Sequence, residues 1–310
     1  MAIITAARYN DLQAKVANIL GNGSGEQGYG QTLTSSQVAA ETVIDSQHMS
    51  DLYTDMVKCR VHQVGSVPQS IATVSVGNVI EEDSSDTGTA RGIVQYEALA
   101  DTIVDDKDLI YTADTSQSTI TASKVASTRT ASWAGVVDHI VTVTWPSADA
   151  RRHFFNAGGE IRFTADLDPD VSNGKNNDWN NLLSQMGVVS FKAQTCTSNG
   201  TSPGTSFNLG NFDITSTDQL VFQKDGSGVY AENDYNIKVK ELSALQLQFT
   251  IQFRDDDAGD DAGDSNNDGA INPIDESVTG TLESVVGERL PTGANVSLST
   301  PAYATTNNLA

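Results

Sequence analysis

The sequence predicts an α+β protein in which an N-terminal helical hairpin is followed by a mainly antiparallel β-sandwich body. Apolar residues recur at three- and four-residue steps in the first 62 positions, a spacing typical of helices. Beyond Gly65 the chain changes to Val, Ile and Thr interrupted by Ser, Gly and Asp, which is typical of short strands and turns. Few segments alternate helix with strand, so a parallel sheet is not expected.

These patterns divide the 310 residues into three regions. We expect a helical assembly segment at 1–66, a β-rich body at 67–286 with an acidic loop insertion at 254–276, and an extended C-terminal arm at 287–310. Two helices alone bury little surface. The helical segment should therefore pack on the body or on copies of itself. From the second alternative we infer a homo-oligomer that assembles through this region.

The first helix is expected at residues 5–20, where Thr5 can cap the start and Gly21 the end. The second is expected at about 36–62, with Met49, Leu52, Met56 and Cys59 forming one apolar stripe. Shorter helices are expected around 96–105 and 178–185.

The clearest strand is 245–253, in which five apolar residues alternate with polar ones, so that one face is dry and the other wet. Further strands are predicted at 71–79, 119–122, 139–144, 160–166, 187–194, 219–222, 236–239 and 277–286.

A folding joint is predicted in the middle of the chain. Ser147 can cap a short helix that carries Phe154 and Phe155, and Gly158-Gly159 can then reverse the chain into a strand that begins at Glu160. We expect both phenylalanines to be buried and both glycines to have positive φ.

Composition limits the partners. The chain has 40 acidic and 18 basic side chains and a formal net charge of −22, which argues against nucleic acid because phosphate binding requires a basic face. No apolar run is long enough to cross a bilayer, so we expect a soluble protein that begins in a cytoplasm. Cys59 and Cys196 are expected to be free thiols.

Candidates for catalysis are weak, and no enzymatic activity or catalytic residue is predicted. The four histidines, His48, His62, His139 and His153, lie in segments that packing or solvent exposure explains. No nucleophile elbow, zinc-protease motif or phosphate-binding loop occurs. The three tryptophans, Trp133, Trp145 and Trp179, are expected to serve the core; a sugar-binding platform is the alternative.

The most specific local pattern is a twelve-residue acidic loop at 264–275. Its expected metal ligands are Asp264, Asn266, Asp268, the carbonyl of Ala270, Asn272 and Asp275, with Gly269 at the sharp turn. Hard oxygen ligands at these spacings favour Ca²⁺. The loop resembles the EF-hand-type calcium loop of dockerin modules, although strand-like sequences flank it here. Two interpretations stay open: a bound calcium ion, or a solvated acidic loop.

The acidic residues just upstream of this loop add support for a cation. Five aspartates, Asp255, Asp256, Asp257, Asp260 and Asp261, would repel one another without a counter-ion.

A wider resemblance covers most of residues 5–190. The string Ser147-Ala148-Asp149 leading into Phe154-Phe155-Asn156-Ala157-Gly158-Gly159-Glu160-Ile161-Arg162, and the block 178–187, resemble an uncharacterised family of virion structural proteins of tailed phages. The N-terminal helix and Gly28-Tyr29-Gly30 are similar to marine cyanophage members with contractile tails.

This resemblance implies a structural component of the virion in the tail, neck or fibre apparatus, assembled in the host cytoplasm with other virion proteins as partners. It implies no catalytic residue. The alternative is a calcium-dependent module that binds a host-surface glycan, and a polysaccharide hydrolase ranks third.

Overall fold

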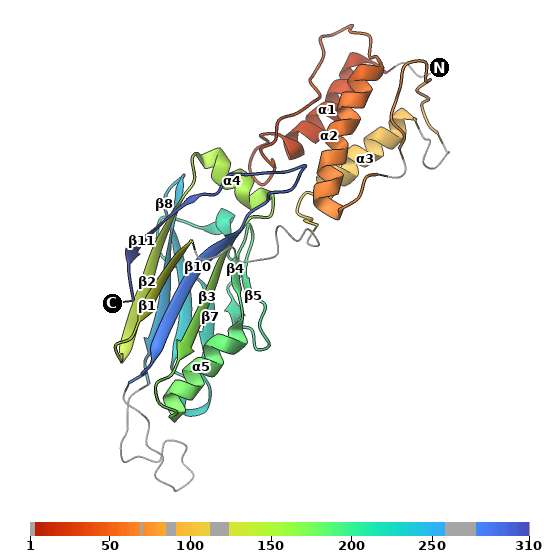
Figure 1. Cartoon of the computed structure of the whole chain (residues 1–310). Helices are drawn as coiled ribbons and strands as arrows, with labels where there is room; N and C mark the ends of the chain where they lie inside the picture. Colours follow the sequence, from red (N-terminus) through yellow and green to blue (C-terminus); the bar gives the residue numbers. More distant parts are fainter. Residues whose placement is uncertain (1–3, 69–70, 85–90, 112–123, 258–276, 310) are drawn as a thin grey trace. The chain divides into compact units, whose positions relative to one another are not determined.

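The computed structural model of the chain describes residues 4–68, 71–84, 91–111, 124–257 and 277–309 (Figure 1). These residues form five α-helices and eleven β-strands, and the strands make two antiparallel sheets. The predicted α+β class with a β-sandwich body is therefore confirmed. The chain divides into a helical unit of residues 1–119, 149–159 and 290–299 and a sheet unit of residues 120–148, 160–289 and 300–310.

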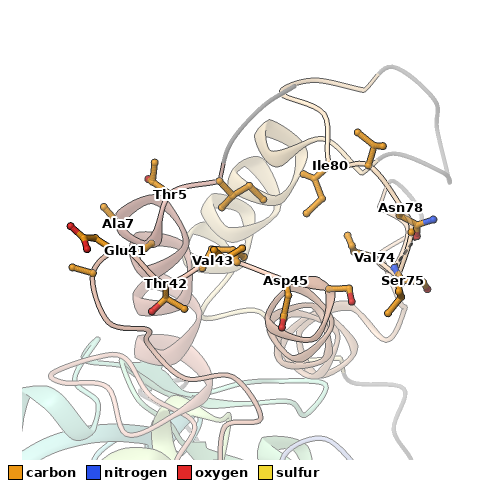
Figure 2. A pocket seen from close by; sticks show the side chains of 18 residues that line it. Thr5, Ala7, Glu41, Thr42, Val43, Asp45, Val74, Ser75, Asn78 and Ile80 are labelled. Carbon is orange, nitrogen blue, oxygen red and sulfur yellow. Dashed lines mark hydrogen bonds between the residues drawn. The ribbon is translucent and has the colours of Figure 1, made fainter.

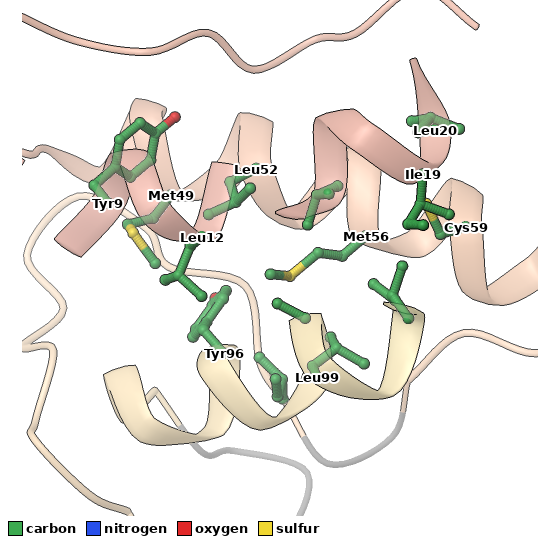
Figure 3. Packing of buried hydrophobic residues seen from close by; sticks show 14 of the residues in the cluster. Tyr9, Leu12, Ile19, Leu20, Met49, Leu52, Met56, Cys59, Tyr96 and Leu99 are labelled. Atoms are coloured by element: carbon green, nitrogen blue, oxygen red, sulfur yellow. The ribbon is translucent and has the colours of Figure 1, made fainter. Parts of the chain in front are cut away.

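Three helices build the core of the helical unit: α1 (Ala6–Leu20), α2 (Ser46–Val64) and α3 (Ile93–Asp105). Thr5 caps α1 as expected, because its Oγ1 accepts a hydrogen bond from the backbone N–H of Arg8 at 3.2 Å. Each helix buries a stripe at helical spacing, as Figure 3 shows. The stripes consist of Tyr9, Leu12, Val16 and Ile19 on α1, Met49, Leu52, Met56 and Cys59 on α2, and Tyr96, Leu99 and Ile103 on α3.

The second helix starts at Ser46, so the prediction of a helix from residue 36 was wrong. Asp45 and His48 form a capping box that fixes the start of α2. The chain before it makes other hydrogen bonds: the side chain of Asn10 on α1 accepts the backbone N–H of Val38 and donates to its carbonyl, both at 2.9 Å. The backbone N–H groups of Thr34 and Ser35 donate to the carboxylate of Asp55, which is buried within α2, at 2.8 to 3.0 Å.

The strand predicted at 71–79 is also absent. Its β-branched residues have no neighbouring strand in the described part of the chain, and Ile71 and Val74 instead bury their side chains in the helical core. The helix expected around 96–105 is present as α3, which lies beyond the predicted region boundary at residue 66 but within the helical unit. The strand predicted at 119–122 lies outside the described residues.

The sheet unit contains a five-stranded sheet in the order β1-β10-β3-β4-β5 and a six-stranded sheet in the order β11-β2-β9-β8-β7-β6. The strands of the first are β1 (Val125–Arg129), β3 (Glu160–Asp168), β4 (Val189–Phe191), β5 (Cys196–Ser198) and β10 (Thr281–Arg289). Those of the second are β2 (Gly135–Thr144), β6 (Thr205–Ser206), β7 (Gln219–Asp225), β8 (Asp234–Ser243), β9 (Gln246–Asp255) and β11 (Ala302–Asn307).

The two sheets pack face to face through alternate side chains. On β9, Leu247, Phe249, Ile251 and Phe253 are fully buried, as the alternation predicted, whereas Leu245 precedes the strand and is 38% exposed. The ring of Phe249 lies 5.2 Å from that of Phe163 on β3 and 5.3 Å from that of Phe191 on β4. Since β3 and β4 belong to the other sheet, these contacts define the interior of a β-sandwich.

The segment predicted as an extended C-terminal arm contains regular structure. β10 continues to Arg289, and β11 pairs antiparallel with β2 along residues 302–307. Most of β11 is exposed. An edge strand of this kind has no dry face, and for that reason its sequence shows no apolar alternation.

The joint in the middle of the chain folds nearly as expected. Helix α4 (Ala148–Asn156) buries Phe154 and Phe155, and Gly158 has a φ of 84°. Gly159 does not share this positive φ, so that part of the prediction was wrong. Its constraint is space, because a Cβ at this position would lie 2.6 Å from the carbonyl oxygen of Phe154. The chain passes from the helical to the sheet unit directly afterwards.

Candidate functional site

The predicted calcium loop lies outside the described residues. This applies to all six expected ligands, Asp264, Asn266, Asp268, Ala270, Asn272 and Asp275, and the calcium site stays a prediction. Among the residues that the structure describes, no group of three or more His, Cys, Asp or Glu side chains is arranged to hold a metal ion.

Three of the five aspartates just before the loop, Asp255, Asp256 and Asp257, have cationic neighbours, while Asp260 and Asp261 lie outside the described residues. Asp256 pairs with Arg254 at 2.6 Å, and Asp255 lies 2.9 Å from the Nζ atom of Lys175. Because cationic side chains face Asp255, Asp256 and Asp257, a metal ion is not required to offset the repulsion among these three carboxylates.

An apolar groove lies on the surface of the helical unit (Figure 2). Three segments line it: the start of α1 with the residues before it (4–7), the connection that leads into α2 (40–46), and the segment 74–80. The groove is an open hollow of about 780 Å³. We call these residues the valine groove, after the side chains on its rim.

Three valines of the valine groove are unusually exposed for apolar side chains. Val76 exposes 93% of its surface, Val43 83% and Val79 62%. Isolated exposed apolar residues are common, but a cluster around a hollow marks a binding surface. Val76 lies within a turn of residues 75–78, and Asn78 stabilises that turn because its Oδ1 accepts the N–H of Ser75 at 2.8 Å.

The charge of the groove contrasts with that of the whole chain. Only Glu41 and Asp45 contribute carboxylates among its eighteen lining residues, and no Lys or Arg lines it. Asp45 is committed to capping α2, and the N–H groups of Gln47 and His48 lower the pKa of this carboxyl. The lining of the valine groove is therefore mainly apolar.

Sequence reasoning missed this groove. The apolar run at 71–79 was interpreted as a strand, whereas the structure buries Ile71 and Val74 and exposes Val76 and Val79. The buried residues are three positions apart and face a helical core, so the run does not have the alternate burial of a strand. Val43 gave no signal, because it lies in the segment that was predicted to be helical.

Three of the histidines and all three tryptophans are buried, as expected for residues that serve packing. His62 and His153 are buried in the helical unit, where their ring nitrogens contact the carbonyl oxygens of Ala157 and Asn22. His139 is fully buried in the sandwich, and burial lowers its pKa to about 4. All three tryptophans are buried, so they do not form an exposed sugar platform; these are Trp133, Trp145 and Trp179.

Comparison of the chain with protein-family models, with curated proteins and with solved structures gave no match. Within the described part of the chain, no helix has the length and apolar character needed to span a membrane.

Proposed function

We propose that the protein is a structural component of a phage virion, in its tail, neck or fibre apparatus. It acts through homo-oligomeric contacts and through contacts with other virion proteins. The similarity of residues 147–163 and 178–187 to tailed-phage virion proteins supports the class. The valine groove supports the mode of action, because it is an apolar surface that association would remove from water.

The occupant that we propose for the valine groove is the same groove of a second copy. The surface contains both a projecting side chain, Val76, and a hollow beside it. A two-fold contact uses one surface twice, so it requires this combination of projection and hollow in a single patch. Val76 of each copy would enter the groove of the other.

Charge also favours this contact surface. A chain with a net charge of −22 repels its own copies over most approaches. The electrostatic repulsion between copies is weakest at a surface with few carboxylates. The valine groove has two among its eighteen lining residues. The groove is thus suited to a copy of the same acidic chain.

Sedimentation velocity of the purified full chain tests this proposal. Wild-type protein should form a dimer or larger oligomer, and Val76→Asp should shift it towards the monomer by at least tenfold in dissociation constant, because a carboxylate would have to be buried. Val171→Asp is the matched control, since Val171 is 52% exposed and belongs to the sheet unit. A monomeric wild type, or an unaltered Val76→Asp, would contradict the proposal.

Placement in the particle needs a separate measurement. Mass spectrometry of purified particles, separated into tails, necks and capsids, should find the chain in the tail or neck fraction in many copies. Its absence from all fractions would remove the virion assignment but not the groove contact.

A second candidate function is a calcium-dependent module that binds a host-surface glycan, and the ligand pattern at 264–275 favours it. Calorimetry on chelator-stripped protein should then show calcium binding with a Kd of roughly 10⁻⁵ to 10⁻³ M that Asp268→Ala abolishes. A glycan array with and without calcium separates this candidate from a purely structural role. An absence of calcium heat excludes it.

A further inference from the structure

The sheet unit buries a lysine completely. Lys175 is the second residue of α5 (Gly174–Met186), and its side chain has 0% exposure. Its Nζ atom lies 2.9 Å from Oδ1 of Asp255, which is also fully buried, and 3.9 Å from Oδ2 of Asp257. Lysine is almost never fully buried unless it is paired, and here both members of the pair are withdrawn from water.

The spacing of both elements produces this contact. On α5, Lys175 and Trp179 are four residues apart and lie on one face of the helix, about 6 Å apart along its axis. On β9, Phe253 and Asp255 are two residues apart and share one face of the strand, about 7 Å apart. Trp179 packs against Phe253 with ring centroids 6.3 Å apart, which sets Lys175 opposite Asp255.

The surroundings of the pair are dry and aromatic. Trp179 and Phe253 are fully buried, and Tyr235 on β8, whose ring lies 5.2 Å from that of Phe253, is buried as well. In such a site an ammonium–carboxylate pair loses the hydration that stabilises both charges in water. Burial accordingly raises the pKa of Asp255 to about 6, which brings its neutral acid form within reach.

The contact is an ion pair by distance, but Nζ is not well aligned with either carboxylate oxygen of Asp255 despite the 2.9 Å separation. The Nζ atom donates to the backbone carbonyl of Asp257 at 3.2 Å. Oδ2 of Asp257 is buried without a hydrogen-bond partner among the described residues. A buried ion pair of purely structural use would normally satisfy these atoms.

We propose that Lys175 and Asp255 form an intramolecular isopeptide bond, an amide that joins Nζ of the lysine to Cγ of the aspartate. The bond would link α5 covalently to β9 across the interior of the sheet unit. Holding an amine against a carboxyl group in fixed geometry supplies the effective concentration that amide formation lacks in dilute solution. Exclusion of water favours the reaction further, because water is its product.

The reaction balances without any co-reactant. The Nζ–Cγ bond forms and one Cγ–O bond of Asp255 breaks. The ammonium and the carboxylate together lose one water molecule, which consists of that oxygen and two protons from Nζ. Asp257, with its carboxylate 3.9 Å from Nζ, is placed to accept a proton from the amine and pass it to the leaving oxygen.

Asn233 is placed to stabilise the product. Its Oδ1 atom accepts the backbone N–H of Asp257 at 3.1 Å, which fixes the side chain. The side-chain amide of Asn233 faces the carboxyl group of Asp255 and lowers its pKa by hydrogen bonding. The same donor can stabilise the oxygen that remains on Cγ of Asp255 after the bond forms.

Intact-mass spectrometry of the denatured full chain tests the proposal. The mass should lie one water below that calculated from the sequence after N-terminal processing. Protease digestion should then yield a branched peptide that joins Lys175 to Asp255. A full-length mass without this deficit, or a branch at any carboxyl group other than Asp255, overturns the proposal. This test uses wild-type protein and does not depend on whether a variant folds.

Variants identify the groups involved. Lys175→Met should restore the full calculated mass of its sequence. Asp257→Asn keeps both joined residues and should slow the loss of water at least tenfold after expression. The matched control is Lys124→Met: Lys124 pairs with buried Glu288 at 3.0 Å but is itself a quarter exposed, and this variant should still lose one water. A deficit that persists in Lys175→Met would indicate another dehydration, such as a cyclic imide, and would refute the proposal.

Discussion

Acidification should destabilise the sheet unit through His139. This residue lies on the inner face of β2 and is fully buried, with Nδ1 2.9 Å from Oγ of Ser284 on β10 of the other sheet. Burial disfavours the imidazolium and lowers the pKa of His139 from 6.5 to about 4. A fall in pH from 6.5 to about 4 therefore affects the folded and unfolded states differently.

The direction of the effect follows from proton binding. The unfolded chain protonates His139 near pH 6.5, whereas the folded chain resists protonation until about pH 4. Between these values the unfolded state binds more protons, so the free energy of unfolding falls as the pH falls. Each pKa unit corresponds to about 1.4 kcal/mol, and the whole interval therefore contributes at most about 3 kcal/mol. This stabilisation is fully present above pH 6.5.

Urea unfolding measures this contribution, with tryptophan fluorescence as the probe, since all three tryptophans are buried in the sheet unit. The comparison is between wild type and His139→Gln at about pH 7 and about pH 5. Glutamine can keep a hydrogen bond to Ser284 but does not titrate. The wild type should lose about 2 kcal/mol more than the variant over this range. Equal losses in both proteins would refute the assignment to His139.

Two further substitutions test the helical unit. Gly158→Val should lower the free energy of unfolding by about 2 to 4 kcal/mol, because it combines a φ of 84° with a Cβ 2.5 Å from the side chain of Ile110. The control is Gly25→Val, at a positive φ but with open space around it, which should lower the thermal midpoint less. Equal shifts in the two variants would exclude the clash with Ile110. Asp55→Ala should cost about 3 to 5 kcal/mol in urea unfolding, because it leaves the N–H and hydroxyl of Ser35 without their acceptor. A loss below about 1 kcal/mol would show that water replaces the carboxylate there.

Regular local patterns made much of the fold predictable. The alternation at 245–253 identified β9 and its buried face, and the spacing from Tyr9 to Ile19 identified α1. In both segments the apolar residues lie on one face, and that face is buried against the rest of the protein. Such periodicity is a property of the segment itself, and for that reason it can be recognised without knowing what lies opposite.

The failures arose where a distant residue decided the local structure. The chain from residue 36 to Ser46 was predicted to be helical, but the side chain of Asn10 on α1 binds both the N–H and the carbonyl of Val38. The run at 71–79 has the composition of a strand, yet a strand also requires a neighbour to pair with, and composition does not supply one. β11 gave no signal because an exposed edge strand lacks a dry face.

The candidate sites were less predictable than the fold for the same reason. The valine groove joins three segments that are separated by about thirty residues each, and only their assembly creates the hollow. The pairing of Lys175 with Asp255 depends on the packing of Trp179 against Phe253. Neither residue stands out in a chain with 40 acidic side chains. The calcium loop was recognised because its ligands are local.

The contact between two valine grooves can be tested by placing one thiol on the surface. Both native cysteines, Cys59 and Cys196, are buried, so Val76→Cys adds an accessible thiol at the proposed two-fold contact. A short bis-maleimide should cross-link Val76→Cys into a covalent dimer in high yield and leave Val171→Cys largely monomeric. Equal cross-linking of the two variants, or none in Val76→Cys, would contradict assembly through the valine groove.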